Sequence, residues 1–169
     1  MLKEPINILG INPGTRYLAL SVFQGHRLFE WKIKLLKGEW SKKKIERAID
    51  VISECAELHD INRIALKKLH PAHSSKHLEL LVSRIKALAR RKKLRVCQFS
   101  IREIEKYLLE DATHNKKNLA EKMVSDHPCL IHEREKEKIH KNLYYLRMFE
   151  AVALGTACFQ RYLESLAMH

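Results

Sequence analysis

The chain has little glycine or proline and no long apolar run. Five glycines and four prolines among 169 residues are too few for a collagen-like or low-complexity protein. No segment approaches the roughly 18 consecutive apolar residues that span a membrane. The amino terminus also lacks the basic stretch, apolar run and small-residue cleavage site of a signal peptide. These absences predict a globular protein that works in the cytoplasm and has no membrane partner.

The sequence also lacks the cysteine spacings that are typical of disulfide-rich or zinc-binding proteins. The four cysteines are widely spaced and form no C-x-x-C pair: Cys55, Cys97, Cys129 and Cys158. Such spacing favours reduced thiols over a zinc site. Three histidines that lie close in sequence, His70, His73 and His77, could bind a transition metal, but loop and surface histidines without a metal are commoner. We expect no metal-ligating residues in this chain.

Acidic residues are fewer than basic residues. There are 32 lysines and arginines against 20 aspartates and glutamates, which gives a net charge of +12. Such an excess attracts phosphate-rich partners through counterion release and electrostatic steering. A solvated surface rich in salt bridges would have a similar composition. The charge therefore favours DNA or RNA as the partner without establishing it.

The first forty residues have the apolar pattern of strands. Residues 6–12 and 18–23 are short apolar runs, and residues 28–36 alternate between polar and apolar side chains. Alternation of this kind indicates a strand that is buried on one face. A glycine-containing loop at Gly25 is typical of a hairpin between two such strands. The segment predicts three antiparallel strands.

Helical spacing replaces alternation after Ser41. Residues 42–58 carry an apolar stripe at helical spacing, and a second such helix begins after Ser75. Short apolar strands, at 63–69 and 94–99, follow the two helices. Strands separated by helices of this length join a sheet in parallel through right-handed crossovers. Residues 1–169 are therefore expected to form one α/β domain with a mixed five-stranded sheet, three strands antiparallel and two added in parallel, and helices on both faces.

The last third of the chain is predicted to be helical. Ser100 and Glu103 form a capping box that begins a short helix. A further helix is expected at 116–124, and the densely charged residues 133–141 favour a solvated helix or loop over a site. The final helix, at about 145–166, is apolar on most sides. Most of its apolar face is expected in the core, although part could form a homodimer contact.

Four segments, taken in order, resemble the RuvC-type Holliday junction resolvases of the RNase H-like superfamily. The first is ILGINPGTRYLALSVF, and the others begin at Ile64, Lys116 and Arg147: IALKKL, KKNL and RMFEAVALG. Together they extend over residues 8–155. The order of elements predicted above agrees with the RNase H-like fold of that family.

The resemblance implies a specific site and shows how this chain departs from it. Nucleases of that family hold two Mg²⁺ ions with four carboxylates and use them to hydrolyse a phosphodiester. The four positions fall on Asn12, Lys67, Arg147 and Glu150, so only the last keeps a carboxylate. The summed charge changes from −4 to +1, which opposes binding of a divalent cation. We expect that the metal site is lost, that no cofactor is bound, and that Lys67 or Arg147 pairs with Glu150.

Basic side chains near these positions, together with one threonine hydroxyl, are candidates for contact with a phosphate backbone. They come from the turn after the first strand, the end of the fourth strand, the second long helix and the helix at 116–124: Thr15, Arg16, Lys67, Lys68, Lys76, Arg84, Arg91, Lys116 and Lys117. Lys67 could instead form an ordinary buried ion pair with Glu150 that rigidifies the former metal site, and the others could belong to a turn or to a solvated surface.

Three functions remain open at this point. The favoured one is a RuvC-like protein that binds branched or structured DNA but has lost the two-metal nuclease site. The second is an active Mg²⁺-dependent nuclease in which displaced acids act with Glu150, the candidates being Glu103, Asp111 and Asp126. The third is a non-catalytic scaffold or partner subunit.

Overall fold

The computed structural model describes residues 5–110, 112–140 and 143–168, and its centre is a mixed five-stranded sheet. The strands lie in the spatial order β3-β2-β1-β4-β5. The first three strands pair antiparallel, and β4 and β5 are added in parallel, so the predicted topology is confirmed. The strand bounds are β1 Asn7–Asn12, β2 Tyr17–Gln24, β3 Arg27–Leu35, β4 Arg63–Lys67 and β5 Arg95–Phe99.

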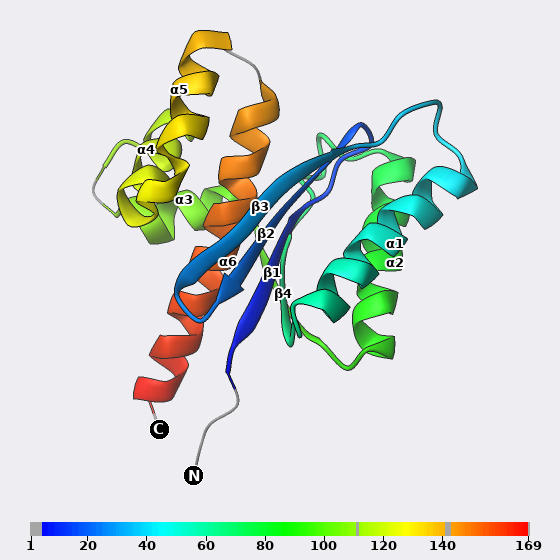
Figure 1. Ribbon diagram of the computed structural model, residues 1–169, viewed down its shortest axis with the longest axis horizontal. Helices are drawn as coiled ribbons and strands as arrows, with labels where there is room; N and C mark the ends of the chain where they lie inside the picture. The colour runs from blue at the N-terminus through cyan, green and yellow to red at the C-terminus, as the bar shows by residue number, and fades with distance from the viewer. Residues whose placement is uncertain (1–4, 111, 141–142, 169) are drawn as a thin grey trace.

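Helices cover both faces of the sheet, as the sequence predicts. Helices α1 (Lys42–Leu58) and α2 (Lys76–Arg91) lie on one face, as Figure 1 shows. The other face is covered by α3, α4 and α6, and a short 3₁₀ turn leads into α5. Their bounds are α3 Ile101–Leu109, α4 Lys116–Asp126, the turn Pro128–Leu130, α5 Ile131–His140 and α6 Leu143–Ala167. Within the described residues, no helix has the length and apolarity needed to cross a bilayer.

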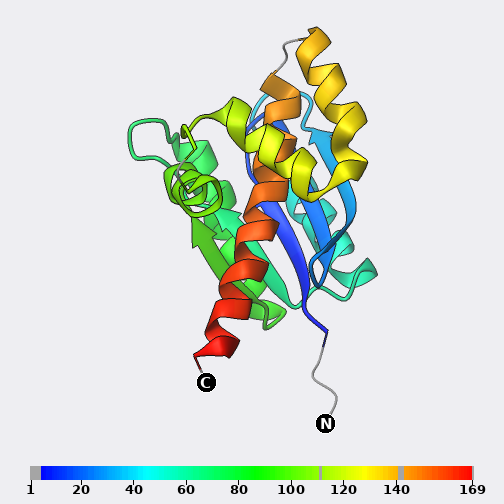
Figure 2. The ribbon, with the colours of Figure 1, turned by 90° about the vertical axis from the view of Figure 1, so that its left-hand side faces the viewer.

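The long helix α6 packs unusually close to the sheet, and Figure 2 shows it crossing the face over β1. A Cβ atom added to Gly10 would lie 2.4 Å from the carbonyl oxygen of Ala151. Ser21 on β2 donates a hydrogen bond of 2.7 Å to that same oxygen. A Cβ on Gly155 would meet the ring of Phe23 at 2.2 Å. Small residues on both elements therefore fix where α6 crosses β1, and this crossing determines which of its side chains reach the end of that strand.

The alternation of the third strand is interrupted by a bulge. Phe23 pairs with Leu28, but its neighbour Val22 pairs with Glu30, so Phe29 is left without a partner across the ladder. An extra residue in one strand shifts the side chains after it relative to the regular pattern. Glu30 therefore shares the face of Val22, toward α1, and Phe29 remains half exposed. The sequence alternation alone did not indicate this irregularity.

Several predicted bounds differ from the structure by one or two residues. The fourth strand ends at Lys67 rather than at residue 69. The backbone of Lys68 still donates to Phe99 at 2.8 Å, but the chain then turns, and His70 Nδ1 accepts from the amide of Ala72. The charged segment at 133–141 lies mostly in helix α5, which ends at His140.

Candidate functional site

The ends of β1 and β4 meet at one edge of the sheet. These strands are parallel, and Ile11 pairs with Leu66, so the next residues, Asn12 and Lys67, come side by side as the strands end. Asn12 is buried, whereas Lys67 is partly exposed. Carboxyl ends of parallel strands are common places for binding sites in α/β folds.

Glu150, on α6, lies directly over this edge and is the centre of a small polar network. Its side chain is only 5% exposed. Oε2 accepts hydrogen bonds from Asn12 Nδ2 at 2.9 Å and from Lys67 Nζ at 3.0 Å. Oε1 lies 3.6 Å from Nζ of Lys116 at the start of α4. The buried carboxylate is thus compensated from β1, β4 and α4 at once.

Arg147 lies one helical turn before Glu150 and contributes in a different way. Its backbone carbonyl accepts a second hydrogen bond from Asn12 Nδ2, at 3.1 Å. Its guanidinium lies against Gly14, where an added Cβ would be 2.6 Å from Nη1, and it approaches the ring of Tyr17 at 5.8 Å. Of the two cations expected to pair with Glu150, Lys67 is the one whose side chain reaches it. We refer to Asn12, Lys67, Lys116, Arg147 and Glu150 as the edge network.

The edge network does not fit a divalent cation. The network contains three cationic side chains and one carboxylate, a surplus of two positive charges, and Lys67 and Lys116 are the cations that contact the carboxylate. Both oxygens of that carboxylate already contact an ammonium group. Mg²⁺ requires several oxygen ligands, anionic ones in particular, and the remaining acceptor is the neutral Oδ1 of Asn12, which is buried and has no hydrogen-bond partner.

Comparison with known proteins rests on structure, because no family model and no curated protein matches this sequence. RuvC of Thermus thermophilus superposes with a TM-score of 0.70 at 14% identity, covering 94% of this chain and 97% of that chain. The yeast mitochondrial Holliday junction resolvase Ydc2 superposes with a TM-score of 0.63 at 13% identity, covering 95% and 81% of the two chains. This chain has a RuvC-like fold. The low identities establish the fold alone.

Several of the residues predicted from sequence to contact phosphate lie near the same edge of the RuvC-like fold. Thr15 and Arg16 follow β1 and help to line a hollow of about 560 Å³, together with Trp40 and Lys44. Ser75 and His77 line it as well, which places Lys76, at the start of α2, beside it. Lys68 follows β4 directly, and Lys117 follows Lys116 on α4. The structure therefore brings together residues that are up to about a hundred positions apart in sequence.

The other two basic candidates lie elsewhere on the RuvC-like fold. Arg84 and Arg91 lie further along α2, whose start is beside the hollow that Thr15 and Arg16 line. Fifteen residues separate Arg91 from Lys76, which corresponds to about 22 Å along a helix. Both side chains are exposed. They belong to a separate surface and give an internal comparison for the residues at the edge.

Of the displaced acids of the nuclease alternative, the two that lie in the described part of the chain pair with other residues than those around Glu150. Glu103, at the start of α3, pairs with Lys68 at 3.0 Å, and the pKa of its carboxyl is lowered chiefly by that hydrogen bond. Asp126 is at the far end of α4, about 15 Å along the helix from Lys116, and pairs with Lys122. Asp111 lies outside the described residues.

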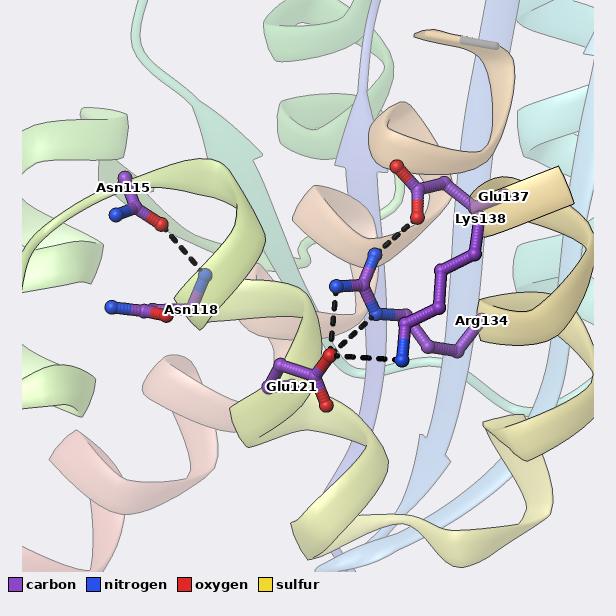
Figure 3. Close-up of polar contacts among 6 residues, drawn as sticks. All are labelled: Asn115, Asn118, Glu121, Arg134, Glu137 and Lys138. Atoms are coloured by element: carbon purple, nitrogen blue, oxygen red, sulfur yellow. Dashed lines mark hydrogen bonds and ion pairs between the residues drawn. The ribbon is translucent and has the colours of Figure 1, made fainter. Parts of the chain in front are cut away.

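Sequence reasoning missed a second polar network, which fixes α5 against α4 (Figure 3). Arg134 is buried, with a side chain that is 5% exposed. Its guanidinium donates to Glu121 at 2.7 and 3.0 Å and also to Glu137, and Lys138 lies 3.4 Å from Glu121. Nothing in the charge pattern of residues 133–141 distinguishes Arg134 from its neighbours, because its partner Glu121 lies thirteen positions earlier. We call Glu121, Arg134, Glu137 and Lys138 the clamp.

The three clustered histidines do not form a common site. His70 and His73 are exposed, with ring centroids 5.0 Å apart. His77 instead packs against Trp40, with centroids 5.1 Å apart. Among the described residues, a single group of three histidine, cysteine or acidic side chains has its ligand atoms within 4.8 Å of one another. It consists of Glu30, Cys55 and His59.

Proposed function

We propose that this chain binds branched DNA, in particular four-way junctions, through the edge network and its basic surroundings, and that it does not cleave DNA with bound metal ions. Two structures with the same fold provide the context: RuvC of T. thermophilus in complex with Holliday junction substrate, and the fowlpox virus resolvase with a Holliday junction, the latter at a TM-score of 0.50. The proposal for this chain itself depends on its own residues.

The observation that carries the proposal is the pairing of Glu150. Its carboxylate, the acid that the edge network retains, is neutralised by Lys67 and Lys116 and hydrogen-bonded by Asn12. A divalent cation would have to displace both ammonium groups and would then have a single anionic ligand. A phosphate, in contrast, would meet a net positive surface, since Lys116 and Lys68 are each about half exposed. The network therefore favours a polyanion over a metal ion.

The first experiment measures binding of a labelled four-way junction in EDTA, with duplex DNA of the same length as the comparison. We expect tighter binding of the junction and a steep loss of affinity with salt. Contact with three to five phosphates gives a slope between about −2.7 and −4.5 on a plot of log K against log [salt]. Failure to bind either DNA at low salt would overturn the proposal, and equal affinity for both would remove its preference for branches. Tighter binding to an RNA junction than to the DNA junction would assign the surface to RNA.

The second experiment tests for cleavage of the same junction in Mg²⁺ or Mn²⁺. We expect the junction to remain intact. Cleavage that disappears in Glu150→Gln would overturn the non-catalytic part of the proposal while leaving the binding part standing. Cleavage that persists in that variant would point to a contaminating nuclease, which repeat purification of the variant protein would remove.

A variant with restored acids tests whether the charge of the edge network is what prevents a metal ion from binding. Asn12→Asp, Lys67→Glu and Arg147→Asp together place acids at all four positions that the resemblance indicates. We expect Mn²⁺ to raise the melting temperature of this triple variant, because bound metal would neutralise the clustered carboxylates. The unmodified chain should show no such shift from the edge network. Equal shifts in both proteins would contradict the charge argument.

Oligomeric state and cellular location stay predictions. Part of the apolar surface of α6 is exposed, including Leu163 and Leu166, which is compatible with the homodimer considered from the sequence. Analytical ultracentrifugation with and without junction DNA measures this directly. We expect the protein to act in the cytoplasm.

A further inference from the structure

The bulge in β3 directs one acidic side chain toward the end of α1. Because Glu30 pairs with Val22, it shares the face of the sheet that α1 covers. There its carboxylate lies 2.8 Å from Nε2 of His59. Phe29, the bulged residue, places its ring beside the same imidazole, with centroids 5.5 Å apart. His59 is thereby held in one position, and its side chain is only 11% exposed.

A buried thiol completes the group. Cys55 and His59 are four residues apart at the end of α1, so both project from one face of the helix. Cys55 is a free cysteine and is 3% exposed. The ligand atoms of Glu30, Cys55 and His59 all lie within 4.8 Å of one another. In tetrahedral zinc sites the ligand atoms are roughly 3.3–3.6 Å apart, so small side-chain rotations would bring these three around one ion.

We propose that Glu30, Cys55 and His59 form a zinc-binding site with three protein ligands and a fourth position open to water. One thiolate, one imidazole and one carboxylate are all accepted ligands of Zn²⁺, whereas Mg²⁺ and Ca²⁺ favour oxygen ligands alone. Glu30 is 38% exposed, which leaves a path for the ion and a place for the water. The bound ion would fasten the end of α1 to the edge strand β3.

Two features of the surroundings bear on this site. Lys32 lies on the same face two residues beyond Glu30 and is exposed, so its ammonium can turn to solvent when a cation binds. Burial raises the pKa of the Cys55 thiol, and Lys32 opposes that rise. A bound metal would displace the thiol proton, as it does from ligating cysteines in general.

The site is separate from the edge network. Lys44, near the start of α1, lines the hollow beside Thr15 and Arg16. Cys55 is eleven residues further along the same helix, about 17 Å. Metal binding here can therefore be measured without DNA, and its failure would leave the proposed binding of branched DNA untouched.

The experiment adds Co²⁺ or Zn²⁺ alone to the full-length protein, purified in the presence of a chelator and then freed of it. We expect one equivalent of Co²⁺ to give a thiolate-to-cobalt charge-transfer band and tetrahedral d–d bands. Competition with a chromophoric chelator gives the zinc affinity, and Zn²⁺ should raise the melting temperature. Absence of the charge-transfer band at saturating Co²⁺ would overturn the proposal.

Variants assign the ligands. Cys55→Ser should abolish the charge-transfer band, whereas Cys129→Ser, at an exposed cysteine, should leave it intact. Glu30→Gln is a surface change that should not disturb folding, and we expect it to weaken zinc at least tenfold. The double variant His70→Gln and His73→Gln controls for adventitious binding by the exposed histidines. Stoichiometric binding that survives Cys55→Ser and Glu30→Gln but is lost in the histidine double variant would refute the site.

Discussion

The edge network and the clamp are opposite solutions to the same electrostatic problem. In the edge network a buried anion, Glu150, is surrounded by cations. In the clamp a buried cation, Arg134, is surrounded by anions. Both networks use α4, which contributes Lys116 to the first and Glu121 to the second. Helix α4 therefore carries charge of one sign at its start and of the other sign one and a half turns later.

The difference between the networks lies in their charge balance. The clamp has two bases and two acids and is neutral, whereas the edge network has three bases and one acid. Burying a charge is costly unless it is paired, and a neutral network satisfies that requirement without needing a ligand. The positive surplus of the edge network is not needed to neutralise Glu150. Under the proposed function, this surplus beside a partly exposed surface is the feature that would attract a polyanion.

The largest expected effect comes from breaking the clamp. Arg134→Leu leaves Glu121 and Glu137 facing each other without their shared cation. Removing one partner of a buried ion network typically costs about 3 kcal/mol or more, and we expect a loss of that size in urea unfolding. The matched control is Lys138→Leu, because that side chain is 58% exposed and should cost less than 1 kcal/mol. Equal losses in the two variants would contradict the assigned role of Arg134.

Breaking the edge network should cost less and should depend on which partner is removed. Lys67→Met leaves the buried carboxylate of Glu150 with Asn12 and with Lys116, whose ammonium is 3.6 Å away and more exposed, and we expect a loss of about 2 kcal/mol. Glu150→Gln leaves Lys67, which is 29% exposed and can turn to solvent, so the loss should be about 1 kcal/mol. Urea unfolding of both variants measures the difference. A larger loss in Glu150→Gln than in Lys67→Met would contradict this argument. It would mean that the favourable interactions of the charged carboxylate outweigh the cost of burying it without Lys67.

The fold could be predicted because its signals are local. Alternation in β3, helical spacing in α1 and α2, and serines at their starts all act between near neighbours in sequence. Ser41 and Ser75 indeed cap α1 and α2 through their side chains. The bulge at Phe29 could not be read in the same way, because it depends on how β2 pairs with β3. It moved Glu30 to the face of α1 and so created the group with Cys55 and His59.

The candidate site was predictable only in part, for the same reason. The resemblance aligned Asn12, Lys67, Arg147 and Glu150, and their charges indicated that Lys67 or Arg147 pairs with Glu150, but not which of the two. The position of the Arg147 guanidinium on Gly14 depends on the close approach of α6 to β1, which no local pattern reports. The clamp was missed because Arg134 and Glu121 come from different helices. Cys55 and His59 did give a signal in their four-residue spacing, but the third ligand comes from another element.

Next in size is the effect of single basic residues on DNA binding. Lys117→Ala and Arg16→Ala each remove one of the phosphate contacts that the proposed function assigns near the edge network, so each should reduce the salt slope by about 1 and weaken binding uniformly across sequences. Arg91→Ala removes an equal charge about 22 Å along α2 from Lys76 and should change neither quantity. Junction binding at several salt concentrations tests all three. If Arg91→Ala has the same effect as the other two, then binding depends on overall charge, and the edge has no special role.

The smallest expected effects are those of pH on the free energy of unfolding. They distinguish the clamp from a third buried polar group, His127 with its partner Thr156. The hydrogen bond from Arg134 lowers the pKa of Glu121 below its ordinary value of 4.5, so the stability it provides is present above that value and is lost as pH falls through the lowered pKa. Burial lowers the pKa of His127 below 6.5, although the charge of Asp126 opposes this shift. Its neutral ring is bonded to Thr156 at 3.0 Å, and protonation favours the unfolded chain. Stability should therefore fall in two stages, the first beginning as pH drops below 6.5 and the second below 4.5.

His127→Gln should remove only the first stage and Glu121→Gln should reduce only the second, as followed by urea unfolding between pH 3 and 8. The exposed His73 serves as the control, since His73→Gln should leave both stages in place. A first stage that persists in His127→Gln would assign the pH dependence to another histidine and leave the clamp as the acid-sensitive network that this structure explains.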